Sequence, residues 1–217
     1  MSNSEGVSIE KMSLEAQCVE LSLPLEEIQL EYDGRPEPAL LKHFENLGYV
    51  GSFIEGYTFL TVLKALMLDK LVELNTLNDR HDACTRYLEA QLTIHRDKLG
   101  EIIDSIRCTS KGKYLGNLRE IFGQPFIQKK YPNLSFECCE ALFNSIDKEI
   151  FISAAKKFSE DPYSYRSGWP DLIIVKDCEV RFVEVKTTDK LHKSQLLTIS
   201  TFQKILPYDF SVCRVRK

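Results

Sequence analysis

The sequence predicts an α/β fold in which a long helical region precedes a compact strand–strand–helix–strand unit. Residues 58–74, "TFLTVLKALMLDKLVEL", carry apolar side chains at the three-and-four spacing of a helix. Near residue 170 the period changes: "DLIIV" (171–175) and "VRFVEVK" (180–186) are short, rich in β-branched residues and separated by the polar turn "KDCE". Residues 192–206 return to helical spacing, and "FSVCRVR" (210–216) alternates as a last strand.

Helices dominate the chain before that unit. Helical spacing is visible in residues 38–49, 58–74, 81–106, 135–146 and 148–161, while glycines and prolines break residues 110–134 into short pieces. The predicted core positions are Phe59, Val62, Leu63, Leu66, Met67, Leu71, Leu88, Leu92 and Ile102. Residues 1–36 are expected to form a weakly ordered, peripheral N-terminal arm.

Composition indicates an ordinary globular protein. Hydrophobic residues make up 43% and charged residues 28% of 217 residues, enough to bury one core. No stretch approaches the ~18 consecutive apolar residues of a membrane-spanning helix, and the acidic N-terminus lacks an export signal. An intracellular location is expected, in the cytoplasm of a prokaryote or virus-infected cell or in a eukaryotic nucleus. The seven cysteines include no C-x-x-C pair, which favours free thiols.

Charge is distributed unevenly along the chain. Residues 1–60 carry eleven acidic and three basic side chains, whereas residues 186–217 carry seven basic and two acidic ones. A positively charged face near the C-terminus could contact phosphates without reading sequence. The candidates are Lys190, Lys193, Arg214 and Arg216, and the last two share one side of the final strand. A solvated basic surface explains the same residues equally well.

Asp171, Glu184 and Lys186 form the pattern that most directly indicates chemistry. Residues two apart in a strand point to the same side, so Glu184 and Lys186 share a face and Val183 and Val185 point to the core. A hairpin partner that starts at Asp171 places a second carboxylate beside Glu184. An isolated Glu–Lys pair is usually a solvated ion pair, but an aspartate thirteen residues earlier, across a hairpin of suitable length, favours a site.

Two adjacent carboxylates repel each other and are costly to desolvate, and a hard divalent cation relieves both problems. Mg²⁺ and Mn²⁺ prefer such oxygen ligands, and the backbone carbonyl of Val185 could add another. Lys186 would stand beside a metal-bound water or a phosphate. These groups together suit phosphodiester hydrolysis.

The segment from "GWPDLIIV" through "FVEVKTTDKLHKSQLL" to "FSVCRVR" resembles the VRR-NUC domain, a branch of the PD-(D/E)xK nucleases. Upstream, "EGYTFLTVLKALMLDKL" and "YLEAQLTIHRDKL" are similar to helices of the Fanconi-associated nucleases. The resemblance implies a restriction-endonuclease-like core, a mixed sheet flanked by helices, with a large helical insertion. The implied division is an arm (1–36) and a nuclease domain (37–217), with the insertion at about 76–165 and the catalytic β-β-α-β core at 168–217.

The same resemblance assigns the site. Asp171, Glu184 and Lys186 match the signature Asp, Glu and Lys, with Glu55 as a third metal carboxylate and Glu89 as a candidate fourth. Gln195 matches the glutamine that opens the following helix and joins the DNA-binding set. Ser194 stands where the family more often has lysine, and Lys193 could substitute for it from one position earlier.

The expected function is Mg²⁺- or Mn²⁺-dependent hydrolysis of phosphodiester bonds in branched or flapped DNA during repair or recombination, by endonuclease or exonuclease action. A dimeric nuclease that cuts four-way (Holliday) junctions is one alternative, although the helical region between Glu55 and Asp171 would obstruct such a dimer and favours a monomer. A non-catalytic nucleic-acid-binding module that retains the fold is another, and a nuclease acting on RNA is a third. No membrane partner is expected.

Overall fold

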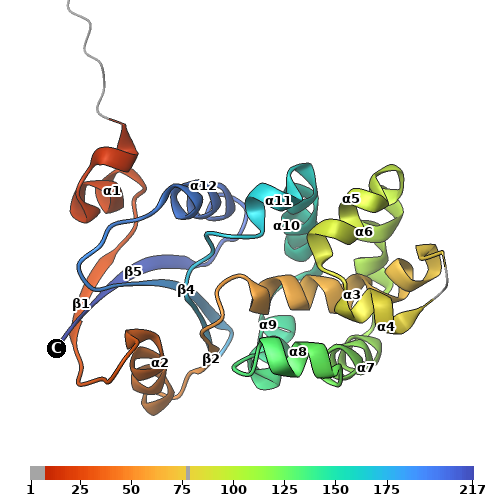
Figure 1. The fold of residues 1–217 in the computed structure, drawn as a ribbon, viewed down its shortest axis with the longest axis horizontal. Coiled ribbons are helices and arrows are strands. Elements are labelled where there is room, and N and C mark those ends of the chain that lie inside the picture. The colour runs from red at the N-terminus through yellow and green to blue at the C-terminus, as the bar shows by residue number, and fades with distance from the viewer. Residues whose placement is uncertain (1–7, 77–78) are drawn as a thin grey trace, which may run out of the picture.

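The computed structural model describes residues 8–76 and 79–217 and is built around one five-stranded mixed sheet (Figure 1). The strand order is β1-β5-β4-β3-β2. β5 runs parallel to both β1 and β4, while β3 runs antiparallel to β4 and to β2. The strands are β1 (Leu25–Gln29), β2 (Val50–Ser52), β3 (Leu172–Lys176), β4 (Glu179–Lys186) and β5 (Asp209–Arg216).

The α-helices gather mainly at one end of the molecule, beyond the sheet (Figure 1). Eight of those described, α4 to α11, lie in the chain between α3 and β3, in the region expected to carry the helical insertion. The α-helices are α1 (Leu14–Glu20), α2 (Pro36–Asn46), α3 (Tyr57–Leu74), α4 (Arg80–Thr85), α5 (Leu88–Ile94), α6 (Leu99–Cys108), α7 (Lys111–Phe122), α8 (Pro125–Lys130), α9 (Phe136–Ser145), α10 (Lys148–Glu160), α11 (Pro162–Tyr165) and α12 (Lys193–Phe202). Short 3₁₀ turns, η1 (Ile9–Lys11) and η2 (Arg96–Lys98), accompany them. No described helix is long and apolar enough to cross a bilayer.

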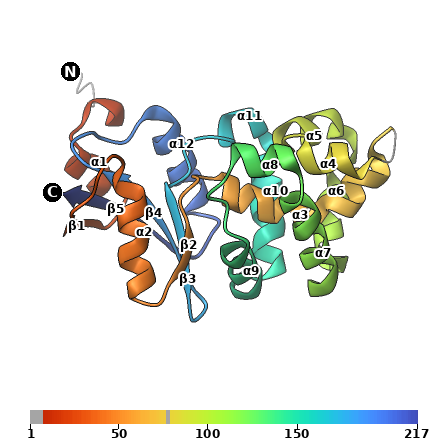
Figure 2. The ribbon, with the colours of Figure 1, turned by 60° about the horizontal axis from the view of Figure 1, so that its bottom comes forward.

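Alternate residues of the sheet build two separate cores. Val183 and Val185 pack with Leu40 and Phe44 of α2 on one face of the sheet, and Figure 2 shows α2 lying along it. Phe182, together with alternate residues of β3 and β5, joins the larger core on the opposite face. The predicted orientation of Val183 and Val185 is therefore confirmed, and Glu184 points away from α2 toward α12.

The helix α3 is the centre of the larger core. Most of its residues are buried because α4, α6, α7 and α9 pack around it. The nine core positions predicted for this region are all at most 2% exposed: Phe59, Val62, Leu63, Leu66, Met67, Leu71, Leu88, Leu92 and Ile102. Serine and aspartate caps begin several of the surrounding helices, as where Ser135 accepts a hydrogen bond from the amide of Cys138. All seven cysteines are free thiols; five are buried, and Cys108 and Cys178 are exposed.

The N-terminal segment differs from the predicted arm. Residues 1–7 lie outside the described part, but residues 25–29 form β1, which pairs in parallel with β5 from Leu25 opposite Val212 to Gln29 opposite Arg216. Leu14 and Cys18 of α1 are buried in the larger core, and Gln17 accepts a hydrogen bond from the amide of Leu191 at 2.8 Å. The described part of this segment thus forms an edge of the sheet instead of a peripheral arm.

Trp169 fixes the approach to β3. Its ring is 1% exposed, its Nε1 donates to the carbonyl of Tyr165 at 2.7 Å, and it packs against Phe59 and Phe202. Gly56, just before α3, leaves the room for it: a Cβ there would lie 2.2 Å from the Trp169 ring. The start of α3 is thereby joined to the first strand of the site.

We expect Gly56→Ala to lower the free energy of unfolding by about 1–3 kcal/mol, since the added methyl must displace a packed indole. Gly116→Ala is the matched control: it lies within α7 with nothing within 4 Å of its Cβ position, so helix propensity should stabilise it by about 0.5–1 kcal/mol. Urea unfolding of both variants measures the difference. Equal unfolding midpoints would contradict this packing.

Candidate active site

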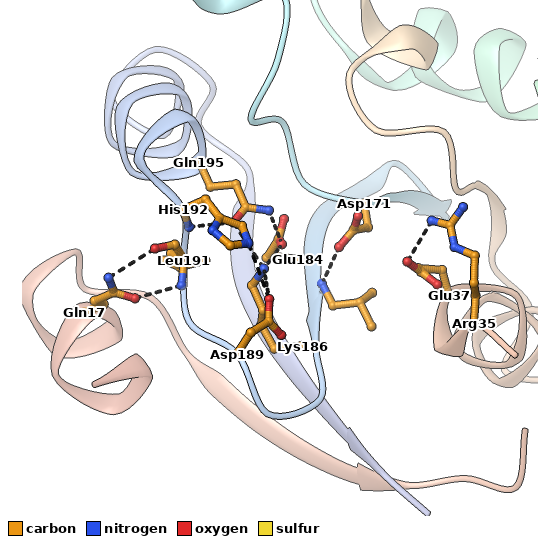
Figure 3. Close-up of polar contacts among 11 residues, drawn as sticks. Gln17, Arg35, Glu37, Asp171, Glu184, Lys186, Asp189, Leu191, His192 and Gln195 are labelled. Atoms are coloured by element: carbon orange, nitrogen blue, oxygen red, sulfur yellow. Dashed lines mark hydrogen bonds and ion pairs between the residues drawn. The ribbon is translucent and has the colours of Figure 1, made fainter. Parts of the chain in front are cut away.

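The strands β3 and β4 bring Asp171 and Glu184 together as the sequence predicted. Leu172 pairs with Val183 in the antiparallel ladder, so the residues just beyond them, Asp171 and Glu184, lie opposite each other at the end of the pair. The Oδ2 atom of Asp171 accepts a hydrogen bond from the amide of Val185 at 2.9 Å, which fixes its carboxylate beside β4 (Figure 3).

Glu184 is fully buried, at 0% exposure, and its two carboxylate oxygens have different surroundings. The Oε1 atom accepts hydrogen bonds from Nε2 of Gln195 and from Nζ of Lys186, the latter at 2.9 Å. The Oε2 atom has no hydrogen-bond partner among the described residues. Burial, reinforced by the nearby Asp171 carboxylate, raises the pKa of Glu184 well above its ordinary value. The charge of this carboxylate is therefore costly even beside Lys186, and a divalent cation would lower that cost.

Lys186 is nearly buried, at 4% exposure, and lies among acceptors. Its Nζ contacts Glu184 at 2.9 Å, Oε1 of Gln195 at 3.1 Å and Asp189 at 3.3 Å. Burial alone would lower the pKa of Lys186, but the Glu184 and Asp189 carboxylates outweigh it and raise that pKa above its ordinary value. Lys186 is therefore a permanent cation at neutral pH, suited to hold a phosphate oxygen or a water.

Gln195 connects these side chains to α12. Its Oε1 accepts from the backbone amide of His192 at 2.9 Å, which closes the first turn of the helix, while its Nε2 donates to Glu184. The same Oε1 contacts Nζ of Lys186. Gln195 lies at the start of a helix, as predicted. In the structure its side chain also binds both Glu184 and Lys186.

Glu55 and Glu37 lie on the other side of Asp171. Glu55 is exposed, its backbone has a φ of 52°, and its amide donates to the carbonyl of Asp171 at 3.3 Å. A non-glycine residue in this left-handed region is uncommon and often marks a functional position. Burial raises the pKa of Asp171, and the charges of Glu37 and Glu55 raise it further. The negative charges of Glu37 and Glu55 therefore make ionisation of Asp171 more costly.

Sequence reasoning missed Glu37. It lies in the first turn of α2, where an acidic residue ordinarily stabilises the helix dipole. Its Oε1 is paired with Arg35 at 2.8 Å, and its Oε2 is buried without a hydrogen-bond partner among the described residues (Figure 3). Proximity to Asp171 arises from packing of α2 on the sheet, which no local pattern reports.

Glu89 is buried in α5, and Arg166, at 3.7 Å, is its charged partner. It lines a cavity of about 560 Å³ that Glu55 and Arg35 also line. The structure thus connects Glu89 to the site through this cavity, while its role as a fourth metal ligand stays a prediction.

A divalent cation fits the Asp171–Glu184 pair. The donors are all carboxylate oxygens, as Mg²⁺ and Mn²⁺ prefer, and the unpartnered Oε2 of Glu184 is a ready ligand. The side chains of residues 8–76 and 79–217 do not bring three His, Cys, Asp or Glu groups into one metal-binding cluster. Asp171 and Glu184 would hold the cation, with Glu55 and the carbonyl of Val185 as the predicted further ligands.

The predicted DNA-contacting cations are mostly engaged elsewhere. Arg214 pairs with Glu15 and Glu27, and Arg216 pairs with Glu27 at 2.9 Å. Lys190 donates to the carbonyl of Glu10 at 2.6 Å. The two arginines do share a face of β5, but Glu15 and Glu27 of the N-terminal segment pair with them, and Arg216 stays exposed. Their contact with DNA stays a prediction and would require these pairs to open. Lys193, at the exposed start of α12, has no such partner among the described residues.

A family model described as the VRR-NUC domain matches residues 109–217, which include Asp171, Glu184, Lys186 and Gln195. This chain belongs to the VRR-NUC nuclease family. The match begins just before α7 and therefore also takes in helices that precede the catalytic strands. No curated protein matches the chain.

Two crystal structures of paFAN1, each bound to gapped 5′-flap DNA, share the fold of this VRR-NUC chain. The complex with a two-nucleotide flap has a TM-score of 0.58 at 23% identity and covers 89% of this chain and 37% of paFAN1. The complex with a one-nucleotide flap has a TM-score of 0.59 at 22% identity, covering 89% and 38%. The chain thus spans less than two fifths of the proteins it matches. The mixed sheet flanked by helices is the predicted PD-(D/E)xK-like fold.

Proposed function

We propose that this VRR-NUC chain is a metal-dependent nuclease that hydrolyses phosphodiester bonds in flapped or branched DNA, in repair or recombination inside the cell. The observation that carries the proposal is Glu184. Its carboxylate is fully buried, bonded on one oxygen to Lys186 and Gln195, and unpartnered on the other oxygen beside Asp171. A binding module gains nothing from such a costly carboxylate pair, whereas a hydrolytic site requires it.

Each residue has a distinct role in the proposed reaction. When bound, Mg²⁺ or Mn²⁺ would polarise a phosphoryl oxygen and lower the pKa of a water. Asp171 and Glu184 hold that cation, and the Val185 amide fixes the direction of the Asp171 carboxylate. Lys186, protonated and held by Gln195 and Asp189, stabilises the negative charge that develops on the phosphate. Glu55, whose amide donates to the Asp171 carbonyl, is the third proposed metal-binding carboxylate.

The proposed substrate rests on two observations. Both paFAN1 structures hold 5′-flap DNA, and helices α4 to α11 extend the molecule beside the catalytic strands. A helical addition of this size obstructs the close dimer of a four-way-junction nuclease, which favours a monomer acting on flaps.

The test is cleavage of labelled 5′-flap, four-way-junction, duplex and single-stranded DNA, with an RNA flap beside them, in Mg²⁺, in Mn²⁺ and in EDTA. We expect cutting that requires metal and is fastest on the 5′-flap. If a dimer cut the four-way junction in preference to the flap, the proposed flap substrate would be wrong and the junction-nuclease alternative would be supported. DNA binding without cutting in any metal would support the non-catalytic module instead.

A further inference from the structure

The cavity next to Glu55 is lined mainly by residues that have no assigned part in metal binding. It has a volume of about 560 Å³, within the range of pockets that hold small organic groups. Its walls come from the start of α3, from α5, and from the segments that follow α8 and α11. Since Glu55 and Arg35 also line it, the cavity opens beside the carboxylates that would hold the metal.

Aromatic rings form one wall of the cavity. The rings of Tyr57 and Tyr131 are stacked, with centroids 3.5 Å apart and planes inclined by 16°. Tyr87 lines the cavity as well, and Nζ of Lys130 lies 4.7 Å from the centroid of its ring. Leu60 and Leu88 add apolar surface. Such a wall suits a flat aromatic group better than a phosphate.

The cations of the cavity are largely occupied by other groups. Arg35 pairs with Glu37, and Arg166 lies 3.7 Å from Glu89. Lys64 is buried and donates to the backbone carbonyls of Cys84 at 3.1 Å and Arg86 at 2.8 Å, and burial lowers its pKa to about 8. A phosphate pocket would present converging free donors. Lys130, the fourth lining cation, is exposed and donates to the hydroxyl of Tyr87, so these cations do not converge on one phosphate position.

Two buried polar groups of the cavity are only partly satisfied. The hydroxyl of Tyr57 is buried and makes no hydrogen bond within the described residues. The Glu89 side chain is buried, and its carboxylate receives no hydrogen bond from any described residue, with Arg166 too distant to donate one at 3.7 Å. Buried polar groups are normally satisfied. A hydroxyl without a partner, and a carboxylate held only by a long ion pair to Arg166, could receive the polar edge of a nucleobase, while the aromatic rings suit its face.

We infer that this cavity receives one nucleobase of the DNA strand, extruded from the stack next to the scissile phosphate. The inference rests on the proposed nuclease function and adds a subsite to it. The base would stack on the Tyr57–Tyr131 wall and present its edge to Tyr57 Oη and Glu89, while its phosphate faces Asp171 and Glu184. Extruding a base has an unstacking cost that is smallest in flaps and other single strands, so the subsite favours such substrates.

The test is a double-mutant cycle on DNA binding. The parent is Lys186→Ala, assayed in EDTA so that the DNA stays uncut, with a 5′-flap substrate carrying either a normal or an abasic nucleotide next to the cleavage position mapped with wild type. Dissociation constants come from fluorescence anisotropy for the parent and for Tyr131→Ala, Tyr131→Phe and Tyr163→Ala in that background. Tyr163 is half exposed on α11, outside the cavity, and serves as the matched control. Thermal unfolding verifies that each variant is folded.

We expect base removal to weaken binding by about 5- to 150-fold in the parent, in Tyr131→Phe and in Tyr163→Ala, and by less than about 2-fold in Tyr131→Ala. A 2-aminopurine at the same nucleotide should change fluorescence on binding to the parent and not to Tyr131→Ala. Equal effects of base removal in all four proteins would overturn the subsite while leaving metal-dependent cleavage intact. A loss that follows removal of the DNA's 5′-phosphate instead would also overturn it. Absence of DNA binding by the parent and by wild type would overturn both proposals.

Discussion

Replacing Lys186 by alanine is expected to reduce the single-turnover cleavage rate of a flap substrate by about 100- to 1,000-fold, the usual effect of removing one group that stabilises transition-state charge. Lys186 Nζ lies 2.9 Å from Glu184 and 3.1 Å from Gln195, so its ammonium group is fixed in place before substrate binds. Because Lys186 is not expected to bind the metal, the metal concentration for half-maximal rate should change little. Quenched-flow or manual single-turnover assays across a Mn²⁺ titration measure both quantities.

Lys156→Ala is the matched control for this change. Lys156 is an exposed lysine on α10, so its removal alters the net charge equally without touching the site. A Lys186→Ala protein that cuts at the rate of the control would rule out Lys186 as a catalytic residue. A loss of DNA binding in Lys186→Ala, with no further loss of rate at saturation, would make it a binding residue instead.

Glu184→Gln is expected to stabilise the metal-free protein while it abolishes cleavage. Glutamine keeps the shape of the side chain and an oxygen for Lys186, but it removes a buried negative charge beside Asp171. Because burial and the Asp171 charge make the ionised form of Glu184 costly even beside Lys186, removing that charge should stabilise the folded state wherever Glu184 would ionise. Lys186 retains Asp189 at 3.3 Å as its charged partner, so the change does not leave it isolated. Urea unfolding in EDTA measures the gain.

The difference in unfolding free energy between Glu184→Gln and wild type should depend on pH in a defined direction. Because the folded-state pKa of Glu184 is raised well above its ordinary value of about 4.5, folding favours the protonated form. The stability that wild type gains from protonated Glu184 is fully present below pH 4.5 and is lost as pH rises toward the folded-state pKa. The advantage of Glu184→Gln should therefore be smallest near pH 4.5 and grow toward pH 8, and saturating Mg²⁺ should raise the stability of wild type alone. A pH-independent difference would show that ionisation of Glu184 does not destabilise the folded protein.

The strand pair that carries the site was predictable because residues close together in the sequence determine its geometry. Side-chain alternation alone places Glu184 and Lys186 on one face, and a short turn at residues 176–179 brings Asp171 opposite Glu184. The buried positions of α3 were predictable for the same reason, since their spacing along one helix is visible in the sequence. Gln195 followed from the family resemblance, and its hydrogen bonds to His192 and Glu184 required the structure.

Features that depend on distant pairing were not predictable. The strand β1 contains Glu26, Glu27 and Gln29 and reads as polar, and its partner β5 lies more than 180 residues further along the chain. Glu27 therefore could not be foreseen as the partner of Arg214 and Arg216, although their common face was correctly predicted. Glu37 likewise reaches Asp171 through packing of α2 on the sheet.

The most direct measurement is the cleavage rate of a labelled 5′-flap as a function of Mn²⁺ concentration, for wild type and for Glu184→Gln. The proposed site predicts no cutting in EDTA, a rate that saturates with Mn²⁺ for wild type, and no cutting by the folded variant at any concentration. Cutting in EDTA, or a variant that cuts as wild type does, would contradict the assignment of Asp171 and Glu184 as the carboxylates that hold the metal.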